Sequence, residues 1–405
     1  MHSIFRASVL GLAFLFGLHS AEAEISNNRI KLGVLTDFSG SAADATGMGS
    51  FVAAQLAVED YGRKLLGEIP IEIIKADHQS KPDIASAIAR KWLDVEGVNA
   101  ILDTTFSSAA LAVNEVTRGS KAVFLPSGAG TTELTGAKCS PNTVHWTYDT
   151  YSTANGVISA LLKRGLKSWF FITSDYAFGH SLEADGTRII KASGGEVLGS
   201  VRHPSYTNDL SSFVLQAMNS KAQVIGLANS VTDTQMSVKQ AQEFGLEQGG
   251  QQLAGLVILL TDVHALGLQA AQGLYLTAAF YWDMNEGTRA FADRFAARMN
   301  GTRPTMLQAG VYSAVAHYLK SVAAISSTDG QAVVAEMKKM PVSDPLFGDG
   351  YIRADGRNMH DMYLFQVKKP SESKGDWDLY NLIEKIPAEV AFRPLSESTC
   401  QLLKQ

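Results

Sequence analysis

The feature that most constrains the fold is a regular alternation of strand-like and helix-like segments along most of the chain. Short apolar runs rich in β-forming residues predict strands, and the longer periodic stretches between them predict helices. The first series has expected strands at 30–36, 69–76, 98–103 and 121–125, with helices at 47–64, 81–96 and 107–119. The second has strands at 168–173, 196–201, 223–228, 253–260 and 273–278, with helices at 152–164, 178–193, 208–219, 232–244 and 262–269. This order predicts an α/β protein with two doubly wound lobes, each a parallel sheet with helices on both faces.

The C-terminal third breaks the alternation. Helices are expected at 287–300, 306–325 and 330–340, followed by a strand pair at 350–354 and 361–368 that the turn at 355–358 joins. Such a late strand pair must add to an existing sheet, so the chain is expected to cross between the lobes more than once. Repeated crossings make a hinge. A cleft between two hinged α/β lobes, at the C-terminal ends of the strands, is a natural small-molecule site.

The first 23 residues have the features of a secretory signal peptide. Arg6 supplies positive charge, residues 9–18 form an apolar stretch, and Ala21-Glu22-Ala23 is a small-x-small cleavage site. A short buried helix is the alternative, and a segment of this length is too short to span a bilayer. No cysteine lies near the cleavage site, so no lipid anchor is expected. We therefore expect an exported protein that is cleaved near Ala23 and is periplasmic in a two-membrane bacterium.

Size, charge and motif content exclude several classes of function. About 380 residues remain after cleavage, which is right for two domains. The net charge of −5 without a basic cluster argues against nucleic acid and against an anionic membrane surface. No GxSxG, HExxH, CxxC, EF-hand or P-loop pattern occurs, and the nine histidines show no metal-ligand spacing. We therefore expect no catalysis, no metal and no cofactor.

The chain has two cysteines, Cys139 and Cys400. An even pair in an oxidising compartment indicates a disulfide, and two buried free thiols are the alternative. The disulfide is favoured because Cys400 lies in a terminal tail with few other means of attachment.

Two loops after successive strands of the first lobe look suited to an anion. Residues 104–108 and 127–132 supply hydroxyl groups and backbone N–H groups near a helix start. Ordinary N-capping by serine or threonine is the alternative for either loop alone. Because both loops follow neighbouring strands, a binding site is favoured over two unrelated caps.

The second lobe contributes aromatic residues. They lie at 145–151, at the presumed first crossing, and at 174–179, after an expected strand. Aromatic side chains beside loop glycines suit a pocket wall, although packing in the hinge is an equal explanation for Trp146. Later strand ends offer Asn229 and Asp262.

At these residues the chain resembles the type I periplasmic solute-binding proteins of ABC transporters, in the leucine/isoleucine/valine-binding family. The resemblance covers nearly all of the mature chain and rests on LGVLTDFSG near the start, FLPSGAGTTELTG at 124–136 and DYAFGHSLEADG at 175–186. It implies two Rossmann-like lobes joined by a three-segment hinge, with ligand trapped as they close. The implied parts are a signal peptide (1–23), a first lobe (24–147 plus 278–345), a second lobe (148–277 plus 346–370) and a C-terminal tail (371–405) that the disulfide ties back.

The resemblance also implies roles for individual residues. The ligand carboxylate would be held in the first lobe by Phe106, Ser107, Ser127, Gly128 and Ala129. The second-lobe wall would be Tyr151, Phe178 and Asn229, with Asp262 near the acidic residue that meets a ligand ammonium.

The sequence departs from the amino-acid binders of this family in three ways. Residue 106 is aromatic where they place a serine, Asn229 and Ser230 stand where they carry a tyrosine, and the loop at 127–132 is one residue longer. The chain also resembles the branch that imports aromatic or other small organic acids, and its cysteine pair fits that branch. The expected ligand is therefore an amino acid or an aromatic or aliphatic organic acid, and these departures put its amino group in doubt.

The expected function is that of a monomeric binding protein that delivers its solute to an inner-membrane ABC permease. A sensory ligand-binding module is one alternative, which would need a transmembrane segment or a signalling domain. A periplasmic enzyme with no recognisable motif is the other.

Overall fold

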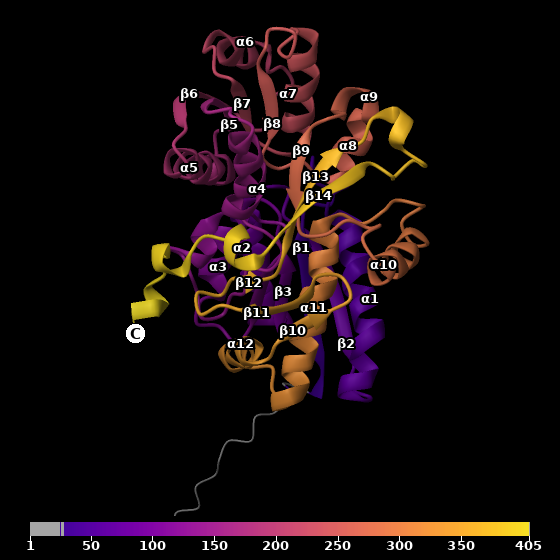
Figure 1. Ribbon diagram of the computed structural model, residues 1–405. Helices are drawn as coiled ribbons and strands as arrows, with labels where there is room; N and C mark the ends of the chain where they lie inside the picture. Colours follow the sequence, from indigo (N-terminus) through magenta and orange to yellow (C-terminus); the bar gives the residue numbers. More distant parts are fainter. Residues whose placement is uncertain (1–24, 26–27, 405) are drawn as a thin grey trace, which may run out of the picture.

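The computed structural model describes Ile25 and residues 28–404, and the predicted signal peptide lies outside these residues. Two α/β lobes stack one above the other, with the N-terminal strands in the lower lobe and helices α4 to α9 in the upper one (Figure 1). Within the described residues, no helix is both long enough and apolar enough to cross a membrane.

The first lobe is built on a parallel sheet with strand order β2-β1-β3-β4. Its strands are β1 (Ile30–Thr36), β2 (Ile71–Asp77), β3 (Ala100–Asp103) and β4 (Val123–Pro126). Its helices are α1 (Gly47–Leu66), α2 (Pro82–Lys91), α3 (Ser107–Thr117), α10 (Glu286–Ala296), α11 (Met306–Ile325) and α12 (Gly330–Lys339). Strands β1, β3 and β4 are buried at every position, as expected for a parallel sheet covered on both faces.

The second lobe repeats this plan with strand order β6-β5-β7-β8. Its strands are β5 (Ser168–Ser174), β6 (Glu196–His203), β7 (Val224–Ala228) and β8 (Gln252–Gly255). Its helices are α4 (Thr150–Lys163), α5 (Ala177–Ala192), α6 (Ser211–Asn219), α7 (Val231–Glu243), α8 (Leu260–Leu266) and α9 (Leu268–Ala271). The two predicted lobes with parallel sheets are confirmed, but the fifth strand expected in the second series, 273–278, forms β9 (Tyr275–Ala278) outside the parallel sheet.

The late strand pair differs from the prediction. Strand β11 (Gly348–Ile352) pairs with the short β12 (Asn358–Met359) and with β10 (Val342–Asp344), and it does not pair with the segment at 361–368. That segment forms β13 (Met362–Val367), which lies between β9 (Tyr275–Ala278) and β14 (Tyr380–Ile386) in an antiparallel sheet. The turn at 355–358 joins β11 and β12, which pair over only two residues. The next strand, β13, then pairs with β9, which is distant in sequence. Strand β14 and the short helix α13 (Ala388–Ala391) lie in the segment predicted as a tail.

The hinge is held by one buried cation. Arg357 is fully buried, and it donates hydrogen bonds from Nη1 to the Tyr148 carbonyl at 2.8 Å and from Nη2 to the Trp146 carbonyl. Residues His145 and Arg357 also form a parallel bridge, so two crossing segments lie side by side. Trp146 is fully buried and donates from Nε1 to Ser313 Oγ at 2.9 Å, which makes it hinge packing.

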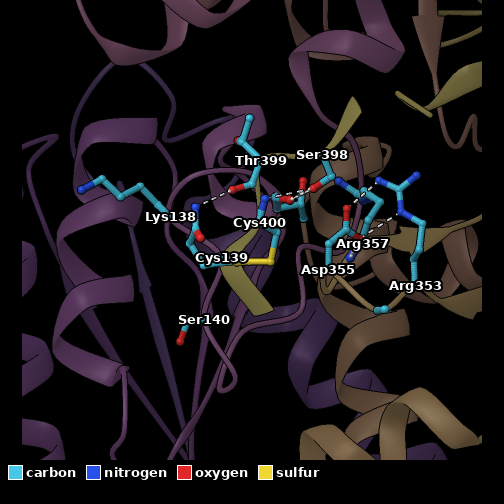
Figure 2. Close-up of a disulfide and its surroundings, with 12 residues drawn as sticks. Lys138, Cys139, Ser140, Arg353, Asp355, Arg357, Ser398, Thr399 and Cys400 are labelled. Atoms are coloured by element: carbon cyan, nitrogen blue, oxygen red, sulfur yellow. Dashed lines mark hydrogen bonds and ion pairs between the residues drawn. A yellow bond between two sulfur atoms is a disulfide. The ribbon is translucent and has the colours of Figure 1, made fainter. Parts of the chain in front are cut away.

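The predicted disulfide between Cys139 and Cys400 is confirmed (Figure 2). It ties the end of the chain to the first lobe. Ser398 adds a hydrogen bond from Oγ to the Thr135 carbonyl at 3.1 Å, and the ring of Phe392 lies 4.6 Å from the Arg357 guanidinium. The tail is therefore packed against the hinge as well as cross-linked.

Candidate functional site

A cleft lies between the lobes, at the C-terminal ends of β3 and β4 below and of β5, β7 and β8 above. Fourteen residues line it: Ala42, Thr105, Phe106, Ser107, Gly128, Gly130, Tyr148, Tyr176, Phe178, Ser230, Val231, Val257, Leu259 and Leu307. Its free volume is about 30 Å³, which holds about one water molecule. The lobes are therefore closed on each other, and a ligand needs them to part. A wider hollow of about 440 Å³ lies against α7 and α9 and shares no residue with this cleft.

Three helices begin at the cleft. Helix α3 starts at Ser107, α5 starts one residue before Phe178, and α7 starts at Val231. In each, the N-cap residue makes no side-chain capping hydrogen bond. The first N–H groups of a helix have no partner within the helix, and the helix dipole favours negative charge there. The cleft is therefore suited to an anion that needs no basic side chain.

Ser107 and two glycines define the first-lobe side of the cleft. Ser107 Oγ accepts the N–H of Thr131 at 3.2 Å, which leaves its own O–H free to donate. A β-carbon at Gly128 would lie 2.6 Å from Asp103 Oδ1, and one at Gly130 would lie 2.8 Å from a ring carbon of Tyr148. Only glycine fits at these two positions, so the backbone itself forms the surface.

Aromatic rings form the walls. The Phe106 ring lies 6.2 Å from the Tyr176 ring, which in turn lies 6.0 Å from the Phe178 ring. Tyr148 donates its hydroxyl to the Gly128 carbonyl at 3.1 Å. Burial raises the pKa of both Tyr148 and Tyr176, so both phenols stay neutral. The rest of the wall is aliphatic and includes Leu307.

Backbone strain gathers around the cleft. Positive φ angles occur at Asp103 (69°), Thr104 (54°) and Phe106 (66°) in the first lobe, and at Tyr206 (61°) and Val231 (48°) in the second. Residues other than glycine rarely adopt such angles, and a β-branched residue does so at particular cost. Strain of this kind concentrates at ligand sites, which supports a functional role for these loops.

The cleft carries no formal charge. None of its fourteen lining residues is Asp, Glu, Lys, Arg or His. Across the described part of the chain, no group of three or more His, Cys, Asp or Glu side chains is placed to hold a metal ion. The arrangement can bind and enclose a solute, and the lining offers no group with the chemistry of a nucleophile activated by a base.

Four of the predicted site residues line the cleft: Phe106, Ser107, Gly128 and Phe178. Ser127 lies just behind it, with Oγ facing Gly310 of α11, where a β-carbon would lie 3.2 Å away. The Ala129 carbonyl accepts a hydrogen bond from His145 Nε2 at 2.7 Å, so this residue is also packed behind the lining.

The structure places the three other predicted residues outside the lining. Tyr151 is half-buried in the first turn of α4. Asn229 is fully buried and donates from Nδ2 to Ser237 Oγ at 3.0 Å. Asp262 accepts the Leu259 N–H at 2.9 Å and the Gln235 side-chain amide at 2.8 Å, so it caps α8, and burial raises its pKa to about 6.

Other lining residues had no predicted role. Tyr148, Tyr176, Ser230 and Gly130 fall in segments that the sequence had singled out. Val257 and Leu259 fall in the expected strand 253–260, which ends at Gly255, so the apolar residues beyond it belong to the cleft. An apolar run longer than an ordinary strand was the available signal for them.

Several known proteins are similar to this chain over most of its length. Residues 29–376 match the family described as periplasmic binding protein. The chain is 47% identical to a periplasmic binding protein from Burkholderia mallei, covering 93% of this chain and 99% of that one, with a TM-score of 0.90. It is 42% identical to a branched chain amino acid ABC transporter periplasmic ligand-binding protein from Burkholderia xenovorans LB400, covering 92% and 100%, with a TM-score of 0.83. It is 26% identical to a Leu/Ile/Val-binding protein homolog 6 from Brucella suis, covering 85% and 88%.

Proposed function

Because the chain belongs to the periplasmic binding protein family, we propose that it captures a small carboxylate that lacks an ammonium group, for import by an ABC transporter. The observation that carries this proposal is the make-up of the cleft. Three helix starts without side-chain caps converge on a space that is lined by aromatic and aliphatic side chains and carries no formal charge. Backbone donors can replace the water around a carboxylate, and the rings can cover its apolar body.

The choice between an organic acid and an amino acid rests on the second lobe. A buried ammonium needs an acceptor, and leaving it unpaired is costly. The part of the wall near the start of α7 is formed by Ser230, Val231, Val257 and Leu259, none of which carries a charge. Asp262, the acidic residue that the resemblance assigns to a ligand ammonium, already accepts two hydrogen bonds outside the lining. An acid without an amino group suits this wall better than an amino acid does.

The proposed place of action is the periplasm. Residues 1–23 would direct export and be removed near Ala23, and the mature protein would act as a monomer. Its partner would be an inner-membrane ABC permease that accepts the closed, loaded form. The family is one of solute-binding proteins, which supports transport over catalysis.

A thermal-shift screen with matched pairs tests the ligand class. Each pair differs only in the ammonium: 3-phenylpropanoate against phenylalanine, and 4-methylpentanoate against leucine. 4-Hydroxybenzoate and benzoate extend the aromatic set. A ligand at a thousand times its Kd should stabilise the protein by about 4 kcal/mol. We expect shifts with the acids and none with their amino-acid partners.

An Asp262→Asn variant completes the test. We expect it to keep its affinity for the acids, because Asp262 lies outside the lining. If leucine or phenylalanine raises the melting temperature of the wild type but not of Asp262→Asn, the Asp262 carboxylate pairs with a ligand ammonium. That result would contradict the proposal.

A further inference from the structure

A buried carboxyl group lies directly behind the wall of the cleft. Asp103, the last residue of β3, is fully buried, and a β-carbon at Gly128 would lie 2.6 Å from its Oδ1. Its carbonyl accepts the N–H of Ser127 at 3.1 Å, which fixes the two loops together. Asp103 is thus one residue away from the backbone surface that faces a bound ligand.

This carboxyl has little to stabilise a negative charge. Neither of its oxygens makes a hydrogen bond of normal geometry. The neighbouring hydroxyls bond to each other, with Thr36 Oγ1 2.6 Å from Thr105 Oγ1, which donates to Thr46 Oγ1 at 3.1 Å. Burial raises the pKa of Asp103 to about 6, although the hydroxyls of Ser50 and Thr36 and the Gly128 amide lower it.

The titratable groups on the surrounding elements do not neutralise Asp103. At the end of β1, Asp37 accepts the N–H groups that follow it in its own loop. After β2, burial lowers the pKa of His78 to about 4, so this ring is neutral. From the lobe crossing, Tyr148 is a neutral phenol whose pKa burial and the charge of Asp103 raise. Helix α1 contributes only the hydroxyl of Ser50, and none of the groups that act on the pKa of Asp103 is a lysine or an arginine.

We propose that Asp103 must hold a proton whenever a carboxylate occupies the cleft, so that capture of the ligand takes up one proton from solvent. The inference rests on the proposed function. Two carboxylates that share a poorly solvated site cannot both stay ionised without cost. The ligand enters as an anion, Asp103 gains a proton from water or buffer, and no other bond changes. Asp103 acts as a positioning residue for charge, since the backbone at Gly128 separates it from the ligand.

The affinity for a carboxylate should fall as the pH rises above about 6. In the complex Asp103 binds its proton more tightly than in the free protein, so binding is favoured where the proton is present. Below the pKa of the free protein, about 6, Asp103 is protonated with or without ligand and adds no pH dependence. Above it, affinity should fall about tenfold for each pH unit until the pKa of the complex is reached.

Isothermal titration calorimetry with 3-phenylpropanoate between pH 5.5 and 8.5 tests the proposal, in phosphate and in Tris. These buffers differ in ionisation enthalpy, so the two heats together give the number of protons taken up. We expect uptake to approach one proton per ligand near pH 7.5. Asp103→Asn should abolish the uptake, flatten the pH profile, and bind more tightly than the wild type at pH 8. A damaged fold would weaken binding instead.

Asp262→Asn is the matched control. Asp262 is also fully buried with a pKa raised to about 6, but it lies outside the cleft lining, so this variant should keep the uptake. Wild-type affinity that is constant from pH 6 to 8, or an Asp103→Asn variant that still takes up a proton, would overturn the inference alone. If Asp103→Asn does not fold, the proton count of the wild type decides. If no acid of the panel binds, the proposed function fails and the inference falls with it.

Discussion

Replacing Arg357 by methionine should destabilise the protein by about 3–5 kcal/mol, the cost of breaking a buried charge pair by removing one partner. Arg357 is fully buried, with Nη1 3.8 Å from Asp149 Oδ2, and burial lowers its pKa to about 10, so it is a cation at pH 7. Its Nε donates to the Asn358 carbonyl at 3.0 Å, in addition to its bonds to the carbonyls of Tyr148 and Trp146. Methionine fills much of the space but removes the guanidinium donor of the Tyr148 and Asn358 carbonyls, at about 1–3 kcal/mol each where water cannot replace it. The Trp146 carbonyl keeps hydrogen bonds from Asn358 Nδ2 at 3.4 Å and from His360 Nε2 at 3.3 Å.

Urea unfolding followed by circular dichroism measures this loss. A two-lobed protein can unfold in more than one step, so the slope of the transition is compared as well as its midpoint. Arg188→Met is the matched control, because Arg188 is exposed and its pair with Glu397 at 3.4 Å should be worth less than about 1 kcal/mol. Arg357→Lys keeps the positive charge but loses the branched guanidinium that donates several hydrogen bonds at once. Its loss of stability should lie between those of Arg357→Met and Arg188→Met. An Arg357→Met variant within about 1 kcal/mol of wild type would refute this account of the hinge.

Three further outcomes are expected. Ser107→Ala should weaken binding of 3-phenylpropanoate about 10- to 100-fold, the loss of a hydrogen bond to a charged group, whereas Ser108→Ala in the same turn should not; calorimetry showing equal affinities for both would move the anion elsewhere. Cys139→Ser should lower the free energy of unfolding by at most about 5 kcal/mol in the chain-entropy model, and a titration of unfolded, unreduced wild type should detect no free thiol. The raised pKa of Asp262 means that the folded state binds its proton more tightly, so stability should fall as pH rises from about 4 to about 6; Asp262→Asn should reduce that fall, and identical pH profiles of the melting temperature would contradict the assignment.

Much of the fold is predictable from the sequence because parallel sheets and amphipathic helices leave local periodic signals. The strand expected at 30–36 matches β1, and the helix expected at 306–325 matches α11. The strand pair after residue 348 fails for a physical reason. A turn is a local signal, whereas β13 pairs on one side with β9, more than 80 residues earlier, and pairing over that distance depends on packing that no local pattern reveals.

The sequence predicts which loops form the site, but not which residues of each loop line the cleft. In extended backbone, neighbouring side chains point to opposite sides, so an error of one position exchanges the lining for the layer behind it. Ser230 is extended, with φ −155° and ψ 168°, and it lines the cleft while Asn229 faces the interior. The same exchange separates Gly128 from Ser127 in the other lobe.

Two properties of the cleft cannot be predicted from residue type alone. The anion-binding groups are backbone N–H donors at helix starts, and every residue except proline supplies one, so their convergence depends on how the lobes meet. Asp103 is the opposite case: its type is visible, but a polar residue at a strand end ordinarily faces water. Only the folded first lobe places that carboxyl behind Gly128, with neither oxygen in a hydrogen bond of normal geometry. If backbone N–H groups bind the ligand's carboxylate, the protonation state of Asp103 behind them sets the affinity. The pH profile of binding is therefore the property that depends on Asp103.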